Sequence, residues 1–141
     1  MLKVIFACIH NAGRSQMAAA FFNQMADPAK ANAVSAGTDP AAQVHPEVMA
    51  VMRELGIDLT QATPQKLTDA LVQDASLLIT MGCGEQCPYV PGLRREDWML
   101  PDPKGLPLEK VREIRDTIQR RVADLIAQEG AAKSSGSVTS A

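Results

Sequence analysis

The chain has 141 residues, of which 46% are hydrophobic and 21% are charged, and its formal net charge is −2. This length and composition are typical of one globular domain and exclude a disordered or fibrous chain. The slightly acidic balance argues against a nucleic-acid-binding surface, and no apolar run approaches the ~20 residues that a membrane-spanning helix needs. We therefore expect a single globular domain that binds neither nucleic acid nor a membrane.

The three cysteines are too few, and odd in number, for a secreted fold that disulfides stabilise. The first apolar run, residues 2–9, is interrupted by His10, Asn11 and Arg14, which is not the pattern of a secretory signal. We expect a cytoplasmic protein with reduced thiols. In that setting a cysteine is more often catalytic or redox-active than structural.

Apolar periodicity predicts strands that alternate with helices along the chain. The first half is predicted to form a strand at 2–7, a helix from Ser15 to about Ala26, a strand at 33–36 and a helix from His45 to Gly56. The second half is predicted to form a strand at 75–80, a short strand at 98–100 and a helix from Pro107. This order predicts a parallel sheet with helices on both faces, whose ligand binds beyond the carboxyl ends of the strands.

The last predicted helix carries its apolar side chains on one face, with four arginines off that face: Arg112, Arg115, Arg120 and Arg121. We expect these arginines to be solvated and not to form an anion site. Residues 130–141 contain no aromatic residue and one charged residue. The sequence therefore predicts a folded domain of residues 1–129 and a disordered C-terminal tail of residues 130–141.

The loop after the first strand reads Cys8-Ile9-His10-Asn11-Ala12-Gly13-Arg14-Ser15 and leads directly into a helix. Successive amides in such a turn form a nest for a tetrahedral oxyanion, so we expect the whole segment from Ile9 to Ser15 to bind substrate. Arg14 adds a bidentate clamp on two oxygens. The helix N-terminus, the guanidinium and the Ser15 hydroxyl all favour a thiolate at Cys8, which is the form that attacks.

An inert buried cysteine is the alternative interpretation of Cys8. A cysteine, five residues, an arginine and a serine between a predicted strand and a predicted helix favour a catalytic role instead. We expect His10 to shape the rim of the loop. We expect Asn11 to brace the loop through side-chain hydrogen bonds, with Ser35 as a candidate partner.

Two further cysteines, Cys83 and Cys87, follow the predicted strand at 75–80 in the segment Gly82-Cys83-Gly84-Glu85-Gln86-Cys87-Pro88. Parallel strands end at the same edge of a sheet, so this segment starts on the edge that carries Cys8. Two inert thiols are one alternative, and a soft-metal site is another. Only His10 and His45 could add imidazole ligands, so we expect no zinc site. A pair of thiols beside a reactive third favours thiol–disulfide exchange.

Asp102 lies in the segment Leu100-Pro101-Asp102-Pro103-Lys104-Gly105, far from Cys8 in sequence. Displacing an oxygen from a tetrahedral oxyanion requires a proton donor, and two prolines with a glycine can rigidify the loop that holds one carboxyl group. On these residues alone, Asp102-Pro103 is equally well explained as a turn.

These segments resemble the low-molecular-weight protein tyrosine phosphatase superfamily, and within it the arsenate reductase branch. The resemblance is carried by residues 8–18, Ser35-Ala36-Gly37-Thr38, Thr80-Met81-Gly82-Cys83 and Trp98-Met99-Leu100-Pro101-Asp102-Pro103. It implies a single-domain α/β fold, with a four-stranded parallel sheet flanked by helices on the phosphatase I or flavodoxin-like plan. It also implies that Cys8 is the nucleophile, Arg14 the oxyanion ligand and Asp102 the general acid.

The resemblance to thioredoxin-coupled arsenate reductases implies a relay of three cysteines. Cys8 attacks arsenate, Cys83 resolves the Cys8–arsenic adduct, and Cys87 moves the disulfide to the surface, where thioredoxin reduces it. The chain then needs no bound cofactor or metal, only an external thiol reductant. Phosphate and sulfate are expected to compete with arsenate.

Two features depart from the best-known members of that group. The short spacing between Cys83 and Cys87 resembles members that use mycothiol with its redoxin. The stretch Ala18-Ala19-Ala20 lacks the acidic residue that helps to bind potassium in some members. The cysteine spacing leaves two reductants open, thioredoxin and mycothiol, and the missing acidic residue argues against potassium binding.

Two other functions are compatible with the same residues. A tyrosine phosphatase would use the loop to hydrolyse a phosphocysteine intermediate, but Lys104 follows Asp102-Pro103 where such phosphatases usually place an aromatic residue. A non-enzymatic oxyanion sensor with three thiols is the other alternative, and the chain shows no DNA-reading element to accompany it.

Overall fold

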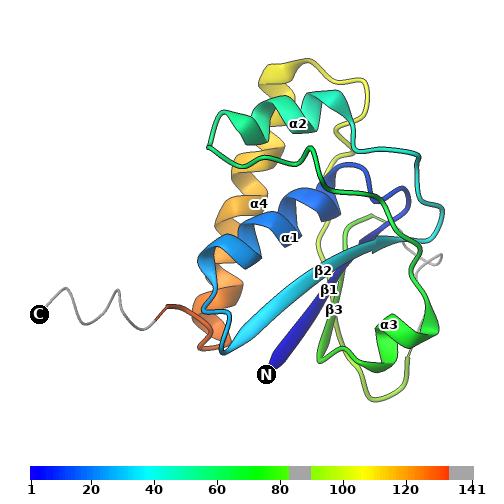
Figure 1. Cartoon of the computed structure of the whole chain (residues 1–141), viewed down its shortest axis with the longest axis vertical. Coiled ribbons are helices and arrows are strands. Elements are labelled where there is room, and N and C mark those ends of the chain that lie inside the picture. Colours follow the sequence, from blue (N-terminus) through cyan, green and yellow to red (C-terminus); the bar gives the residue numbers. More distant parts are fainter. Residues whose placement is uncertain (83–89, 134–141) are drawn as a thin grey trace, which may run out of the picture.

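The computed structural model describes residues 1–82 and 90–133. A four-stranded sheet in the order β2-β1-β3-β4 forms the centre, and each neighbouring pair of strands is parallel (Figure 1). The strands are β1 (Leu2–Cys8), β2 (Ala31–Gly37), β3 (Leu77–Thr80) and β4 (Arg94–Asp97). The helices are α1 (Arg14–Met25), α2 (Pro46–Arg53), α3 (Asp69–Gln73) and α4 (Leu108–Gln128). The predicted α/β fold with a four-stranded parallel sheet is confirmed.

Strand β1 is a central strand whose side chains alternate between two cores. Val4, Phe6 and Cys8 belong to the core that α1, α2 and α4 cover, whereas Ile5 and Ala7 belong to the core beneath α3. Figure 1 shows α1, α2 and α4 on one side of the sheet and α3 on the other. Successive side chains of a strand point to opposite faces, so the position of Cys8 directs its sulfur toward the α1 side.

The carboxyl ends of three strands meet at one edge of the sheet. Cys8 at the end of β1 is in register with Gly37 at the end of β2, and Ala7 is in register with Thr80 at the end of β3. Strand β1 has β2 on one side and β3 on the other, so the connections leave it in opposite directions. In α/β proteins, ligands bind at the carboxyl edge where the strand order reverses in this way.

The last strand lies earlier in the chain than the sequence predicted. The expected strand at 98–100 is wrong, because β4 comprises the charged residues Arg94–Asp97 at the edge of the sheet. Edge strands are commonly charged, which hides them from an analysis of apolar periodicity. The predicted strand at 98–100 began at Trp98, which is buried but lies after the end of β4. Its amide donates to the carbonyl of Thr80 at 2.8 Å, and its ring centroid lies 5.7 Å from that of Phe6.

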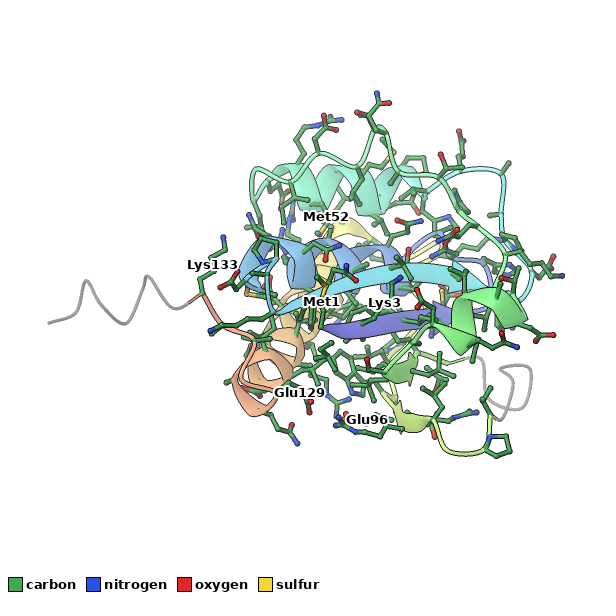
Figure 2. The ribbon with its side chains drawn as sticks, turned by 60° about the horizontal axis from the view of Figure 1, so that its bottom comes forward. Met1, Lys3, Met52, Glu96, Glu129 and Lys133 are labelled. Atoms are coloured by element: carbon green, nitrogen blue, oxygen red, sulfur yellow. The ribbon has the colours of Figure 1, made fainter. Side chains whose placement is uncertain are left out.

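The end of α4 and the residues after it are attached to the rest of the fold. Arg94 of β4 makes two hydrogen bonds, of 3.0 and 2.8 Å, with the carboxylate of Glu129. Glu129 and Glu96 lie along the same side of the molecule (Figure 2). Ala131, in the segment that the sequence assigned to the tail, is 2% exposed, and its carbonyl accepts from the amide of Asp27 at 2.9 Å. Residues 134–141 lie outside the described residues.

Within the described ranges, no helix combines the length and the apolar content that crossing a bilayer requires.

Arg115 is buried, so the prediction that it is solvated is wrong. The residue is 7% exposed, and its Nη1 donates to the carbonyl of Val51 and to the carboxylate of Glu54, both at 2.8 Å. Because α4 packs against α2, this guanidinium reaches the C-terminal end of α2, where a cation is favourable. Arg112 binds the same carboxylate, and the hydrogen bonds from Arg112 and Arg115 lower the pKa of Glu54 from 4.5 to about 2.

We predict that Glu54→Gln removes a pH-dependent part of the free energy of unfolding. A carboxylate whose pKa is depressed in the folded state stabilises the protein above its ordinary pKa of 4.5, and this contribution is lost as the pH falls toward about 2. The wild type should therefore exceed Glu54→Gln in stability at about pH 6, and the difference should shrink by about pH 3. Urea unfolding at the two pH values measures it.

Glu113→Gln is the matched control, because Glu113 is exposed on α4 and pairs with Lys110 at 3.5 Å. Its stability difference from the wild type should change little between the two pH values. A Glu54→Gln difference that stays constant across this range would show that the two guanidinium groups contribute nothing through the charge of Glu54.

Candidate active site

The sulfur of Cys8 lies at the carboxyl end of β1, beneath the loop that joins β1 to α1. Cys8 is 3% exposed. Its Sγ accepts a hydrogen bond from the backbone amide of Asn11 at 3.2 Å and lies 2.8 Å from the hydroxyl oxygen of Ser15. Both neighbours can donate a hydrogen bond to sulfur, and hydrogen bonds of this kind stabilise a thiolate.

The carbonyl groups of the loop face away from the sulfur and toward the chain after β2. The acceptors are the carbonyls of Cys8, Ile9, His10 and Ala12, and the donors are the amides of Thr38, Asp39, Ala41 and His45, at 2.8 to 3.2 Å. In a trans peptide the N–H points opposite to the C=O, so the next amide along the chain faces the other way. The amide of Asn11 shows this direction, because it points at Cys8 Sγ. The loop therefore presents amides on the side of Cys8 Sγ, an arrangement that can bind an oxyanion.

Asn11 sets the direction of the hydrogen bonds around the sulfur. The backbone amide of Gln65 donates to Asn11 Oδ1 at 2.9 Å, which leaves Nδ2 facing Ser15 Oγ at 2.8 Å. Ser15 Oγ accepts this bond, which leaves its own hydrogen available to a thiolate at Cys8 Sγ. Asn11 braces the loop as the sequence predicted, but Ser35 is not its partner. The carbonyl of Ser35 instead accepts from the side chain of Gln65 at 2.8 Å.

Arg14 is the first residue of α1, and its side chain is 10% exposed. Its Nη1 donates to the carbonyl of Leu100 at 2.9 Å, and its Nη2 lies 3.9 Å from Asp102 Oδ2. Gly82, after β3, lies against the same guanidinium with φ +97°, and a Cβ there would collide with it. Glycine is required at this position by the close approach and by the positive φ. Arg14 is thus held between the end of β3 and the segment of Asp102.

The segment that carries Asp102 lies over the cysteine loop. A Cβ placed on Gly13 would come within 2.8 Å of Pro103 Cγ, so the two segments touch where Gly13 has no side chain. The Asp102 side chain is 51% exposed, and its Oδ1 accepts from the amide of Lys104 at 3.0 Å. The structure therefore brings Asp102 to Arg14, although the two are far apart in sequence, and leaves its carboxyl group accessible.

The histidines lie at the outer edge of the loop. His10 Nδ1 is 3.0 Å from the carbonyl oxygen of Asp39, on the exposed side. His45 Cδ2 would lie 3.5 Å from a Cβ on Gly13. In the part of the chain that the structure describes, no three His, Cys, Asp or Glu side chains gather in a group that could hold a metal ion.

Cys83 and Cys87 lie outside the described residues. The last described residue before them is Gly82, which lies against Arg14, and Met81 donates its amide to the carbonyl of Ala7 in β1 at 2.7 Å. The chain therefore leaves β3 beside the loop of Cys8.

The sequence analysis missed two glutamines that contact Asn11. Gln65 bonds Asn11 Oδ1 through its backbone, and the Gln16 side chain donates to the Asn11 carbonyl at 3.0 Å. A backbone amide carries no signal in the residue type, so Gln65 could not have been found. Gln16 directly follows Cys8–Ser15 in the chain, and its proximity to the loop was the one available signal.

Comparisons with known proteins find relatives over most of the chain. A protein family described as low molecular weight phosphotyrosine protein phosphatase matches residues 3–135. The glutaredoxin arsenate reductase of Synechocystis sp. is 37% identical over 131 residues, covering 91% of this chain and 98% of that protein. The family match and the Synechocystis relative each extend over most of the chain.

Two solved structures have the same fold. The thioredoxin-dependent arsenate reductase of Corynebacterium glutamicum matches with a TM-score of 0.80 at 37% identity, over 92% of this chain and 62% of that longer chain. An arsenate reductase in the phosphate binding state matches with a TM-score of 0.79 at 35% identity, over 91% of this chain and 98% of that chain. Because the family match extends over nearly all of the sequence, the chain belongs to the low molecular weight phosphotyrosine protein phosphatase family.

Proposed function

We propose that this protein reduces arsenate to arsenite with Cys8 as the nucleophile. The observation that carries the proposal is the Cys8 sulfur, which lies beneath inward-facing amides and beside the donors of Asn11 and Ser15. A thiolate held there can attack a tetrahedral oxyanion that the loop binds. The relatives named as arsenate reductases, at 35 and 37% identity, support arsenate as this oxyanion.

In the first step the residues from Ile9 to Ser15 bind arsenate through backbone amides, and Arg14 binds two of its oxygens. Phosphate and sulfate compete for the same site, because they are tetrahedral oxyanions of similar charge. The Cys8 thiolate forms a bond to arsenic, and one arsenic–oxygen bond breaks. Asp102 gives its proton to the departing oxygen, which leaves as water. The 3.9 Å between Asp102 and Arg14 supports this role, since Arg14 binds the oxyanion.

The next steps move electrons from thiols to arsenic. The Cys83 thiolate attacks the Cys8 sulfur, the sulfur–arsenic bond breaks, and its electron pair reduces As(V) to As(III), which leaves as arsenite. A Cys8–Cys83 disulfide remains. The Cys87 thiolate then attacks the Cys83 sulfur, which releases the Cys8 thiolate and leaves a Cys83–Cys87 disulfide. Residue type and family resemblance support these two roles.

An external dithiol must reduce the last disulfide, and we propose thioredoxin in the cytoplasm for detoxification of arsenate. The name of the Corynebacterium relative supports thioredoxin, and the name of the Synechocystis relative indicates glutaredoxin as an alternative. Mycothiol with its redoxin is the further alternative that the short Cys83–Cys87 spacing suggests. No tightly bound cofactor takes part in this scheme.

A second candidate function is hydrolysis of a phosphate monoester, which the family description favours. The same loop would form a phosphocysteine at Cys8, and water would then release phosphate. Lys104 follows Asp102-Pro103 where an aromatic residue would grip a phosphotyrosine ring, so we expect this activity to be weak. An aryl phosphate substrate should accompany each arsenate assay.

We predict that Cys8→Ser lowers arsenate reduction to the uncatalysed background while phosphate binding persists. Serine keeps the amides of the loop, but its hydroxyl is a poor nucleophile without a base. Arsenite release in the presence of thioredoxin, thioredoxin reductase and NADPH measures the activity, and calorimetry measures phosphate binding. Turnover of arsenate by this variant above background would refute Cys8 as the nucleophile.

We predict that Asp102→Asn slows formation of the Cys8–arsenic adduct by about 10²- to 10⁴-fold, because the amide has no proton to give. A rapid-quench measurement of arsenite released in a single turnover, repeated over a range of pH, checks this. Asp124→Asn, on the exposed face of α4, is the control and should react at the wild-type rate. A wild-type rate and pH profile for Asp102→Asn would place the acid elsewhere.

We predict that Cys87→Ser releases one arsenite per enzyme and then stops. Cys8 and Cys83 complete the first turnover, but the resulting disulfide stays on a buried sulfur that a protein reductant cannot reach. The measurement is arsenite released per enzyme with thioredoxin, together with peptide mapping of the trapped Cys8–Cys83 disulfide. Cys83→Ser is the contrasting variant, which should accumulate the adduct and release no arsenite.

Cys87→Ser also distinguishes a protein reductant from a small thiol. With mycothiol and its redoxin in place of thioredoxin, a small thiol attacks the arsenic adduct directly, and Cys87→Ser should turn over freely. Sustained turnover of Cys87→Ser driven by thioredoxin would contradict the relay of three cysteines.

A further inference from the structure

We propose that Gln16 is a positioning residue for the Cys8 thiolate, because its side-chain amide holds Asn11 in the conformation that directs hydrogen bonds at the sulfur. The inference rests on the proposed function only in taking Cys8 as the nucleophile. It concerns the state of the thiol before any substrate binds.

Gln16 lies in the first turn of α1 and is 6% exposed. Its Nε2 lies 3.0 Å from the carbonyl oxygen of Asn11 and 3.3 Å from Asn11 Oδ1. A backbone carbonyl can only accept, so the atom of Gln16 that faces it is the NH₂ group. One side-chain amide therefore binds both the main chain and the side chain of Asn11.

Asn11 needs such support because its backbone is in an unfavourable conformation. It is fully buried, and its φ of +51° lies in the left-handed region, which disfavours residues with a side chain although asparagine is tolerated there. The backbone amide of Gln65, whose carbonyl binds Gly37 at the end of β2, donates to Asn11 Oδ1, and the Gln16 side chain donates to the Asn11 carbonyl. The carbonyl bond fixes the peptide plane after Asn11, and with it the left-handed turn.

Two hydrogen bonds to the sulfur depend on this turn. The amide of Asn11 donates to Cys8 Sγ directly, and Asn11 Nδ2 holds Ser15 Oγ, which lies 2.8 Å from the same sulfur and can donate to its thiolate. If Asn11 relaxes, both donors move away from the sulfur together. Removing the Gln16 donor should therefore destabilise the thiolate, although Gln16 does not touch Cys8.

The charged and titratable groups on the elements around Cys8 are the other influences on its ionisation. Among residues 1–82 and 90–133, they include Arg14 on α1, Asp102 on the segment above the loop, His10, His45 and Asp39 at the rim, and Lys66 in the bridge to Gly37. Gln16 is neutral, so its replacement by another neutral side chain leaves all these charges in place.

A pocket beside Gln16 determines which substitutions remove its donor without admitting water. Gln16 lines a pocket of about 300 Å³ together with Asn23, Ser35, Thr63 and Gln65. A small side chain such as alanine would open this pocket to Asn11, and a water molecule could replace the lost donor. Gln16→Met keeps the length of the side chain and removes the donor. Gln16→Glu keeps the shape and places a carboxylate against the two oxygens of Asn11.

The test measures how the alkylation rate of Cys8 by iodoacetamide depends on pH. It uses the Cys83→Ser/Cys87→Ser background, in which Cys8 is the one remaining cysteine of the three. We expect Gln16→Met to raise the midpoint by about one pH unit, which is a tenfold smaller thiolate fraction below the midpoint. Gln16→Glu should raise it further. Gln24→Met, an exposed site on the same helix, should leave it unchanged.

A purely structural role for Gln16 would lower the melting temperature without moving this midpoint. Unchanged midpoints in Gln16→Met and Gln16→Glu would overturn the proposal. Where a variant does not fold, ¹⁵N NMR of the wild type decides: the Gln16 side-chain NH₂ signals should titrate with the Cys8 alkylation midpoint, and signals that ignore it would also overturn the proposal. Arsenate takes no part in these measurements, so the proposed function can fail in its own assays while this inference holds.

Discussion

The direction of the peptide groups between Cys8 and Arg14 is the constraint on which the site depends. Hydrogen bonds from the chain after β2 turn the loop carbonyls outward, and the planar trans peptides then turn the following amides toward the sulfur. This requires the end of β2 to lie against the loop. A Cβ at Gly37 would come within 2.5 Å of the Ile9 carbonyl oxygen and 2.9 Å of the Asn11 nitrogen. The glycine that ends β2 is therefore necessary for this close approach, and with it for the direction of the loop amides.

The side-chain alternation of β1 is a second constraint, because it decides which face of the sheet carries Cys8. Cys8 follows Val4 and Phe6 on the side of the sheet that α1 covers, while Ile5 and Ala7 face the α3 side. A shift of one residue would exchange these faces and carry the sulfur away from α1. Because Arg14 and Ser15 start α1, the alternation of β1 and the position of the helix must agree for the thiolate to meet its donors.

Features that depend on neighbours in sequence could be predicted, and features that depend on distant polar contacts could not. Strand β1, the loop and helix α4 follow from an apolar run, a motif of eight residues and a period of 3.6. The contacts of Arg14 with Leu100, of Asn11 with Gln65 and of Arg115 with Val51 join residues 86, 54 and 64 positions apart. Sequence periodicity does not predict hydrogen bonds between residues so far apart. Strand β4 was missed because its residues are charged, and helix α3 was missed because five residues are too few to show a helical period.

In the proposed reaction, the burial of Cys8 limits how electrons can reach arsenic. With 3% of the residue exposed, a folded redox protein cannot bring its own cysteine to the sulfur of Cys8. Thiol–disulfide exchange requires the attacking sulfur to approach along the bond that breaks. A protein reductant must therefore reduce another cysteine of this chain, which then exchanges its disulfide with Cys8. A small thiol could instead react with Cys8 directly. The chain supplies two further cysteines after β3, the strand beside Cys8, so an internal relay needs no additional partner to approach the buried sulfur.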